Sequence, residues 1–308
     1  MLGYFGPEGT FTHQALLALR PGESAQPYLS VPGVLEAVRH GQITAGLVPI
    51  ENSVEGGVSA TLDYLAGHSR LQIIDEVLLE VAFGLYVRPG TAIEAVRTVL
   101  THPHAAAQVR GWLAEHLPDA SVTEQGSTAD AARRVADPES GFDAAICAAV
   151  AGELYGLEPL ATQIADNRGA VTRFILVSRP VRPAPISGHD KTSLVIHLRA
   201  DQPGGLIEAL QQFAARGINL CRVESRPEKT KIGHYSFSID AQGHVFERRM
   251  QAALAALHRT SRRLVFLGSY PSADGQTVKQ TAGSRDEEFA ASDRWLAGVL
   301  NPSRVRGA

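Results

Sequence analysis

The chain has 308 residues, of which 44% are hydrophobic and 20% are charged, and its formal net charge is -3. This composition is typical of a globular protein, and the length suggests about two domains. The near-neutral charge balance has no basic stripe, which argues against nucleic acid as a partner. No apolar run reaches the roughly 18 residues that cross a bilayer, and the N-terminus lacks a secretory pattern, so no membrane partner is expected.

The two cysteines, Cys147 and Cys221, each lie in an apolar segment. Such positions are typical of small buried hydrophobic residues rather than of a disulfide. A reducing compartment fits this usage, so the sequence favours a cytoplasmic protein.

Residues 1–179 alternate short apolar runs with helical patterns, which predicts an α/β architecture with a largely parallel sheet. Strands or extended runs are expected at 1–6, 43–52, 71–88 and 95–103, and a strand leading into a helix at 143–156. Apolar residues at helical spacing predict helices at 9–20, 31–42 and 104–117. Thr10 or Thr12 is expected to cap the first helix.

Residues 180–190 contain Pro180, Pro183 and Pro185, and this density of proline predicts a linker. Residues 191–270 then follow the order β-α-β-β-α-β that is typical of a ferredoxin-like domain. Its strands are expected at 192–199, 218–227, 233–243 and 262–271, and its helices at 203–217 and 246–259.

The tail, 271–308, is rich in polar residues. This composition predicts an extended, mobile segment from 272 to about 284, and it favours disorder over the whole tail. The alternative is a helix at 287–300, with apolar contacts from Phe289, Trp295, Leu296 and Val299.

Polar clusters interrupt the apolar runs of the first half. "GPEGTF", residues 6–11, forms either an anion-binding helix start or an ordinary capped turn, and its residues alone favour the turn. Glu51, Asn52 and Ser53 directly follow a predicted strand, where ligands gather in open α/β sheets. A helix-capping loop explains these three residues equally well.

Two further clusters are "LTHPHAAAQ" and "TRF". His102 and His104 have no acidic or cysteine partner nearby in sequence, so a metal site is not expected, although His102 could contact a ligand. Thr172 and Arg173 open an apolar strand. The guanidinium fork of Arg173 suits a carboxylate, and the alternative for it is a surface salt bridge.

Taken together, "GPEGTF", "VPIENSVEGG", "THPHAAAQ" and "TRF" resemble, in order and spacing, the prephenate dehydratase family. "PGGL" and "ESRP" resemble the regulatory ACT domain that follows in that family. The resemblance covers residues 2 to about 270. It implies a two-lobed catalytic domain over 1–179, similar to periplasmic binding proteins, a linker over 180–190, and an ACT domain over 191–270. Nothing before Leu2 could hold a chorismate mutase domain, so the monofunctional form is expected.

The resemblance implies conversion of prephenate to phenylpyruvate without a cofactor or metal. It assigns catalysis to Thr172, Arg173, Glu51, Asn52 and Ser53, and substrate binding to Thr10, His102 and Phe174. Thr172 and Glu51 remain alternative proton donors. The family's usual asparagine before "TRF" is replaced here by Ala170, and the nearest asparagine is Asn167.

The ACT resemblance implies inhibition by L-phenylalanine in a homodimer or homotetramer. Its ligand residues would be Pro203, Gly204, Gly205, Leu206, Glu224, Ser225 and Arg226. Two other functions remain open from the sequence. One is a dehydratase of arogenate, and the other is a binding module that holds a small anion without chemistry.

Overall fold

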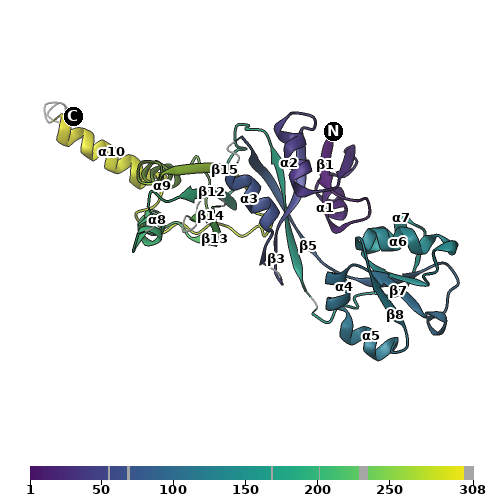
Figure 1. Cartoon of the computed structure of the whole chain (residues 1–308). Helices are drawn as coiled ribbons and strands as arrows, with labels where there is room; N and C mark the ends of the chain where they lie inside the picture. The colour runs from purple at the N-terminus through teal and green to yellow at the C-terminus, as the bar shows by residue number, and fades with distance from the viewer. Residues whose placement is uncertain (55, 68–69, 168, 201, 229–234, 302–308) are drawn as a thin grey trace. The chain divides into compact units, whose positions relative to one another are not determined.

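The structure is a computed structural model (Figure 1), and it describes residues 1–54, 56–67, 70–167, 169–200, 202–228 and 235–301. The chain forms two compact units, one of residues 1–61 and 77–177 and one of residues 62–76 and the chain from 178 on. The second unit therefore includes a short segment from the N-terminal half. None of the described helices is long and apolar enough to cross a membrane.

The first sheet has the strand order β2-β1-β3-β11-β5, and β4 pairs with β3 at the side. Strand β1 runs parallel to both β2 and β3. The strands are β1 (Leu2–Phe5), β2 (Ala25–Tyr28), β3 (Ala45–Asn52), β4 (Gly56–Gly57), β5 (Gln72–Glu80) and β11 (Val171–Ser178). The helices in this part of the chain are α1 (Phe11–Leu19), α2 (Val31–Arg39) and α3 (Ser59–Gly67).

The second sheet has the order β10-β6-β9-β7-β8. Its strands are β6 (Gly84–Val87), β7 (Thr98–Thr101), β8 (Ser121–Glu124), β9 (Ala144–Cys147) and β10 (Glu158–Ala161). Its helices are α4 (Pro103–Gln108), α5 (Arg110–His116), α6 (Thr128–Ala136) and α7 (Ala149–Leu154), with 3-10 turns η1 (Ile93–Ala95) and η2 (Pro138–Ser140).

Strand direction corrects the expectation of a largely parallel sheet. Strand β7 is parallel to β8 and β9, but β6 is antiparallel to both β9 and β10. The chain enters this sheet through β6 and leaves it through β10, and only the strands between them are joined by parallel crossovers. Two mixed α/β sheets result, which confirms the two-lobed α/β prediction for the first half.

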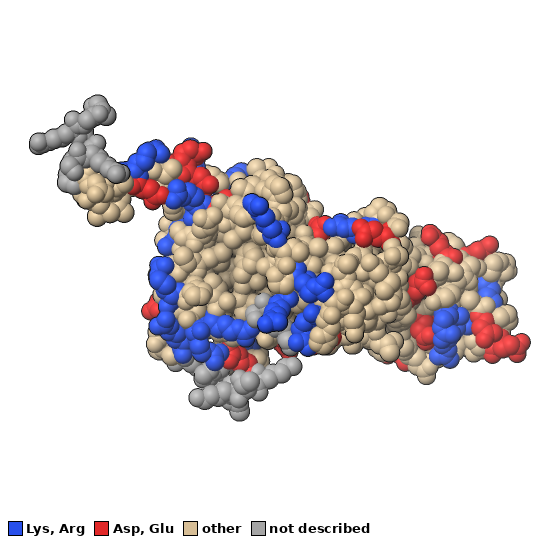
Figure 2. Space-filling model, turned by 90° about the horizontal axis from the view of Figure 1, so that it is seen from above, with Lys and Arg blue, Asp and Glu red and all other residues tan. Residues whose placement is uncertain are grey.

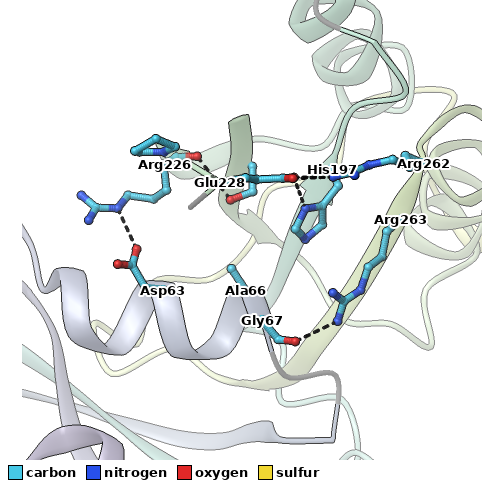
Figure 3. Close-up of a pocket in the computed structure, with 10 residues that line it drawn as sticks. Asp63, Ala66, Gly67, His197, Arg226, Glu228, Arg262 and Arg263 are labelled. Carbon is cyan, nitrogen blue, oxygen red and sulfur yellow. Dashed lines mark hydrogen bonds and ion pairs between the residues drawn. The ribbon is translucent and has the colours of Figure 1, made fainter. Parts of the chain in front are cut away.

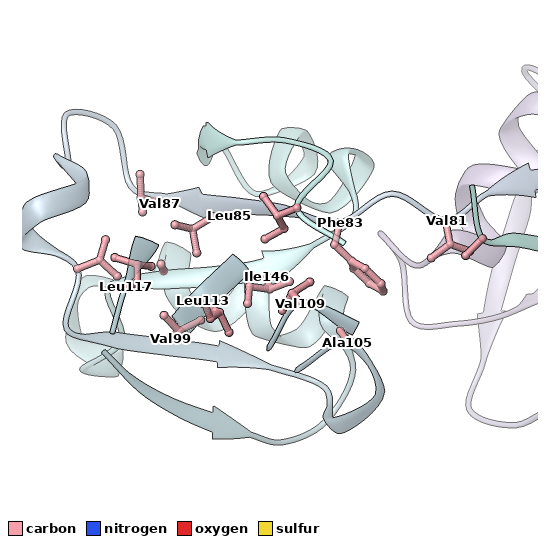
Figure 4. Close-up of a cluster of buried hydrophobic side chains, with 14 residues drawn as sticks. Val81, Phe83, Leu85, Val87, Val99, Ala105, Val109, Leu113, Leu117 and Ile146 are labelled. Atoms are coloured by element: carbon pink, nitrogen blue, oxygen red, sulfur yellow. The ribbon is translucent and has the colours of Figure 1, made fainter. Parts of the chain in front are cut away.

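The second sheet packs on a continuous apolar cluster (Figure 4). Fully buried members such as Leu85, Val99 and Ile146 come from β6, β7 and β9. Ala170, at the position where the family usually has asparagine, is buried in the same cluster. Burial of these side chains supplies the main stabilisation of this sheet.

The single helix expected at 104–117 is instead two helices, α4 and α5, separated at Val109. The Val109 side chain is fully buried in the apolar cluster. The carboxylate of Asp166 accepts from the backbone N–H groups of Gly111 and Trp112, at 2.9 and 3.1 Å. A long-range carboxylate therefore caps the first turn of α5, which the local helical pattern could not reveal.

The C-terminal sheet is antiparallel, with the order β13-β14-β12-β15. Its elements are β12 (Asp190–His197), α8 (Gly205–Ala214), β13 (Leu220–Pro227), β14 (Tyr235–Gln242), α9 (Arg248–Thr260) and β15 (Arg263–Pro271). The predicted ferredoxin-like order is confirmed. Positions 233 and 234 of the third expected strand lie outside the described residues.

One face of this sheet packs on α8 and α9 through an apolar core that includes Leu194, Phe213 and Ile239. The other face is polar. There the Lys191 ammonium lies 2.8 Å from the Glu76 carboxylate, and the two side chains are 10% and 0% exposed. Glu76 also accepts hydrogen bonds from the Ala273 backbone and the Ser272 hydroxyl. The segment 62–76 and the tail thus meet at one buried carboxylate.

The preference for disorder over the whole tail is wrong for residues 286–300, whereas residues 272–284 form no helix or strand, as expected of an extended segment. Val278 donates its N–H to Gly188, and the Gln280 amide donates to Glu247. Helix α10 (Asp286–Leu300) confirms the alternative of a helix at 287–300. The side chain of Glu288 accepts from the backbone N–H groups of Gly283 and Arg285, which stabilises the helix start. Residues 302–308 lie outside the described residues.

The buried ion pair predicts a large stability effect. Replacing Lys191 with Met leaves the fully buried Glu76 carboxylate without its cation, so we expect the free energy of unfolding to fall by about 3–5 kcal/mol. Urea denaturation of the two proteins measures this difference. The double variant Lys191→Met/Glu76→Gln should recover part of the loss, and a single-variant effect below about 1 kcal/mol would show that Glu76 is effectively solvated.

Candidate active site

The first unit contains a pocket of about 670 Å³ beside strands β3 and β11. Helices α1, α4 and α6 all begin at this pocket. Apolar side chains, among them Phe11, Phe83 and Phe174, form part of its wall. Its polar lining residues are Thr10, Thr12, Asn52, His102, His104, Gln108, Ser127, Thr128, Asp130 and Thr172.

Strands β3 and β11 are neighbours, and this pairing joins two predicted clusters that are 120 positions apart in sequence. The Asn52 side-chain amide donates to the Thr172 hydroxyl oxygen at 2.8 Å. The Ser53 N–H donates to the Val171 carbonyl, and the Val171 N–H donates to the Ser53 hydroxyl, both at 2.9 Å. The end of β3 is therefore tied directly to the start of β11.

Successive strand residues point to opposite sides of a sheet, which separates the predicted catalytic residues into two groups. Thr172 and Phe174 line the pocket, whereas Arg173 does not. The Arg173 guanidinium lies 3.5 Å from the Glu51 carboxylate, with side chains 7% and 39% exposed. Glu51 and Ser53 are also outside the pocket lining.

The three helix starts at the pocket are capped by side chains. Thr10 accepts from the His13 N–H and donates to the Pro7 carbonyl. Ser127 accepts from the Asp130 N–H at 3.0 Å, and His102 accepts through Nδ1 from the His104 N–H at 3.2 Å. Helix starts carry partial positive charge and unpaired backbone N–H groups, so they favour anions.

None of the described lining residues is Lys or Arg. An anion in this pocket would therefore be held by helix starts and by neutral hydrogen-bond donors. Within residues 6–11, where an anion-binding helix start was one of the two expectations, the Gly9 N–H donates to His13 Nδ1 at 3.2 Å. Burial lowers the pKa of His13, with Glu8 opposing, which favours the neutral ring that can accept this bond.

Sequence reasoning did not assign several lining residues to the site. These are Gln108 at the end of α4, Ser127, Thr128 and Asp130 at the start of α6, and His104. The stretch "GSTADAA" carries the Ser/Thr signal of a helix start and was the available clue to α6. Gln108 is the last residue of the motif "THPHAAAQ", which was the available clue to it. Asn167 is exposed and does not line the pocket.

The predicted regulatory residues lie in the second unit. Pro203 and Gly204 form the turn into α8, where Gly204 adopts a positive φ of 84°, and Gly205 and Leu206 are the first residues of the helix. On β13, Ser225 pairs with Phe237 of the helix-covered core, so Glu224 and Arg226 point to the opposite, polar face. Within one chain, Leu206 and Ser225 therefore lie on the helix-covered face of the sheet. Glu224 and Arg226 lie on its polar face.

The polar-face residues are paired. Glu224 lies 3.4 Å from Arg222 and 3.7 Å from Arg226, and Arg226 also lies 3.3 Å from Asp63 of α3 (Figure 3). Figure 2 shows Lys and Arg side chains gathered on the surface of the C-terminal part of the chain. Among the described residues, no group of three or more His, Cys, Asp and Glu could hold a metal ion.

Comparison with known proteins identifies the family. The prephenate dehydratase model matches residues 2–182. A prephenate dehydratase of Amycolatopsis methanolica is 47% identical over 97% of both chains. The crystal structure of prephenate dehydratase from Arthrobacter aurescens in complex with L-Phe is 46% identical, covers 97% of this chain and 99% of its own, and superposes with a TM-score of 0.91.

A third structure, of the quorum-quenching acylase GqqA, is 31% identical over 88% of this chain and 97% of its own, with a TM-score of 0.79. The family model and the 47% identical relative span the residues that form the pocket around Asn52 and Thr172. The chain belongs to the prephenate dehydratase family.

Proposed function

We propose that the pocket around Asn52 and Thr172 is where this prephenate dehydratase expels carbon dioxide and hydroxide from prephenate to form phenylpyruvate. The observation that carries the proposal is the 2.8 Å hydrogen bond from the Asn52 amide to the Thr172 hydroxyl, inside a pocket lined by both residues. Aromatisation of the ring drives the reaction, so the protein needs to orient the substrate and assist the leaving hydroxyl.

The hydrogen-bond pattern supports Thr172 as the donor to that leaving group. Because Asn52 donates to the Thr172 oxygen, the hydroxyl proton of Thr172 is available to a second acceptor in the pocket. Negative charge that develops on the departing oxygen is stabilised by such a positioned donor. Glu51, the alternative donor, lies outside the pocket lining, which favours Thr172.

Prephenate carries two carboxylates, and the pocket offers helix starts rather than cations to hold them. The starts of α1, at Thr10, and α6, at Ser127, are the sites we propose for this role. His102 and Gln108 supply further polar groups, and Phe174 supplies an apolar wall for the ring. The expected role of Arg173 as a carboxylate ligand stays a prediction, since here it faces Glu51.

Removal of the Thr172 hydroxyl tests its proposed role as the hydrogen-bond donor to the leaving group. Thr172→Ala and Thr172→Val should each lower kcat by about 10² or more, because one transition-state donor is lost. Val keeps the β-branched shape and so separates chemistry from strand propensity. Steady-state kinetics with prephenate, alongside circular dichroism to verify folding, measures the effect. A folded variant with wild-type turnover would eliminate Thr172 as the donor.

The variants Arg173→Lys and Glu51→Gln together distinguish two roles for Arg173, holding Glu51 in place and binding a substrate carboxylate. If Arg173 acts by holding Glu51 and the β3–β11 junction, both variants should lower kcat by a similar factor, about tenfold, with little change in KM. If Arg173 binds a substrate carboxylate, Arg173→Lys should instead raise KM while Glu51→Gln leaves it unchanged. The same kinetic assay distinguishes the two outcomes.

We also propose that L-phenylalanine inhibits the enzyme through the C-terminal sheet. The Arthrobacter aurescens relative, at a TM-score of 0.91, was crystallised with L-Phe. Residues 203–206 and Ser225 are the predicted ligand residues on the helix-covered side. Strand β13 is an edge strand, and edge strands pair readily with another chain, so pairing between copies would complete the site. A homodimer or homotetramer follows from this proposal.

A matched pair of glycine variants tests the regulatory site. Gly204 and Gly275 both have positive φ, and a Cβ at either meets no atom within 4 Å. Gly204→Leu should raise the L-phenylalanine concentration for half-inhibition at least tenfold, because the side chain blocks the turn before α8. Gly275→Leu carries similar backbone strain and should leave inhibition unchanged. Equal responses in the two variants would place the inhibitor elsewhere.

The two alternatives from the sequence make different predictions for one assay. Incubation of the purified protein with prephenate and with arogenate, followed by detection of phenylpyruvate and phenylalanine, separates the two dehydratases. A module that only binds an anion would form neither product. The expected cytoplasmic location stays a prediction.

A further inference from the structure

His13 lies in the first turn of α1, directly behind the helix start that we propose for a substrate carboxylate. It is half-buried and is not among the described residues that line the catalytic pocket. Its ring stacks on the ring of Tyr4 in β1, with centroids 4.9 Å apart and planes 14° from parallel. This stacking fixes the orientation of the imidazole and therefore the direction in which Nδ1 points.

Two hydrogen bonds join His13 to the turn before the helix. The Gly9 N–H donates to His13 Nδ1 at 3.2 Å, and the His13 N–H donates to the Thr10 hydroxyl oxygen at 3.4 Å. The Thr10 hydroxyl in turn donates to the Pro7 carbonyl at 2.9 Å. This arrangement is similar to a capping box, in which a Glu or Gln oxygen accepts from the backbone at the helix start. Here an imidazole nitrogen takes the place of that oxygen.

The turn that His13 holds is packed against two helices of the second sheet. A Cβ at Gly9 would lie 3.3 Å from Ala151 of α7 and 3.4 Å from Ala129 of α6, so the Gly9 backbone already lies close to both helices. Residues of the same turn line the pocket, namely Gly6, Pro7, Thr10 and Phe11. A displacement of the Gly9 peptide would therefore move the α1 start relative to the α6 start, the two places proposed for the carboxylates.

Only the neutral imidazole can make the bond to Gly9, because a protonated ring carries hydrogen on both nitrogens and has no acceptor. Burial lowers the pKa of His13, and Glu8 opposes this effect. The other titratable groups of this cluster are phenols. Burial, assisted by Glu8, raises the pKa of Tyr4 to about 12 and also raises the pKa of Tyr155. Both phenols are therefore uncharged near neutral pH, and Glu8 is the carboxylate that acts on the ring.

We propose that His13 is a positioning residue for the dehydratase reaction. Its neutral ring holds the Gly9 peptide, and with it the α1 start, in the conformation that binds a carboxylate of prephenate. This role presupposes the catalytic pocket proposed above, and it concerns substrate affinity rather than the chemical step, because His13 does not line that pocket. Protonation of the ring at low pH releases Gly9 and weakens substrate binding.

Kinetics of two His13 variants as a function of pH test this role. His13→Leu removes the acceptor and should raise KM for prephenate about tenfold near neutral pH, with little change in kcat. His13→Gln supplies a neutral oxygen, as in an ordinary capping box, and should recover most of the affinity. Wild-type KM should rise as the pH falls below about 6.5, where the ring gains a proton, and KM of His13→Gln should rise less. The histidines that line the pocket are present in both proteins, so the difference between the two profiles reports on His13.

Hydrogen–deuterium exchange of the segment that contains Gly9, measured by mass spectrometry on the full chain, follows the hydrogen bond without reference to catalysis. Exchange should be slow in the wild type and in His13→Gln, and about tenfold faster in His13→Leu. The matched control is His40→Leu, which removes an exposed histidine of the α2 C-cap outside the pocket lining and should change neither exchange nor KM.

Faster exchange in His13→Leu with unchanged KM would show that His13 is only a structural cap, and the proposal would be wrong. Identical pH profiles of KM in the wild type and His13→Gln would also overturn it, and this comparison decides the question even if His13→Leu does not fold. Failure of the proposed catalytic pocket would instead appear as wild-type turnover in folded Thr172→Ala, so the two failures are distinguishable.

Discussion

The pairing of strands β3 and β11 is the contact on which the catalytic half depends. It joins residues 120 positions apart, so that the Asn52 amide reaches the Thr172 hydroxyl. Two reciprocal bonds between Ser53 and Val171 fix the register at the same point. A shift by one residue would turn Thr172 away from the pocket and bring Arg173 toward it, because side chains alternate along a strand. Register therefore controls which chemistry the pocket contains.

On the proposal that this pocket is the active site, an anionic substrate is held there without cations. Its described lining has no Lys or Arg, yet three helices begin there with capped, oriented N–H groups. Helix starts attract carboxylates through fixed dipoles, which require no flexible side chain to be ordered on binding. In the proposed reaction, guanidinium groups would bind the charged ground state of the substrate strongly. Neutral donors leave more of the interaction for the transition state.

The second unit combines the C-terminal sheet with residues 62–76. One face of the sheet is apolar and packs on α8 and α9, and the other face is polar and packs on that segment. Buried charges there are paired, as at Glu76 with Lys191 and Asp240 with Arg222. Such pairs contribute little net stability but make a wrong arrangement costly, because a lone buried charge is strongly unfavourable. The segment from the catalytic half is thereby held in one position on the regulatory sheet.

Local patterns in the sequence were sufficient to predict most helices and strands. Apolar periodicity identified α1, α2, β3, the four strands of the C-terminal sheet and the two helices packed on it, because each element buries one face and its spacing records which face. The motifs "IENS" and "TRF" indicated the family because each is a short, continuous stretch of sequence. Strand alternation alone could also have shown that Thr172 and Arg173 face opposite sides.

Other features were decided only by the tertiary structure. The break between α4 and α5 depends on Asp166, which is distant in sequence. The order of a tail rich in polar residues depends on Glu76 and Glu247, which accept its hydrogen bonds. The lining role of Gln108 and of the α6 start depends on which strands are neighbours. Local spacing records which face of an element is buried, but contacts across a hundred or more residues depend on strand order and register, which no short stretch of sequence contains.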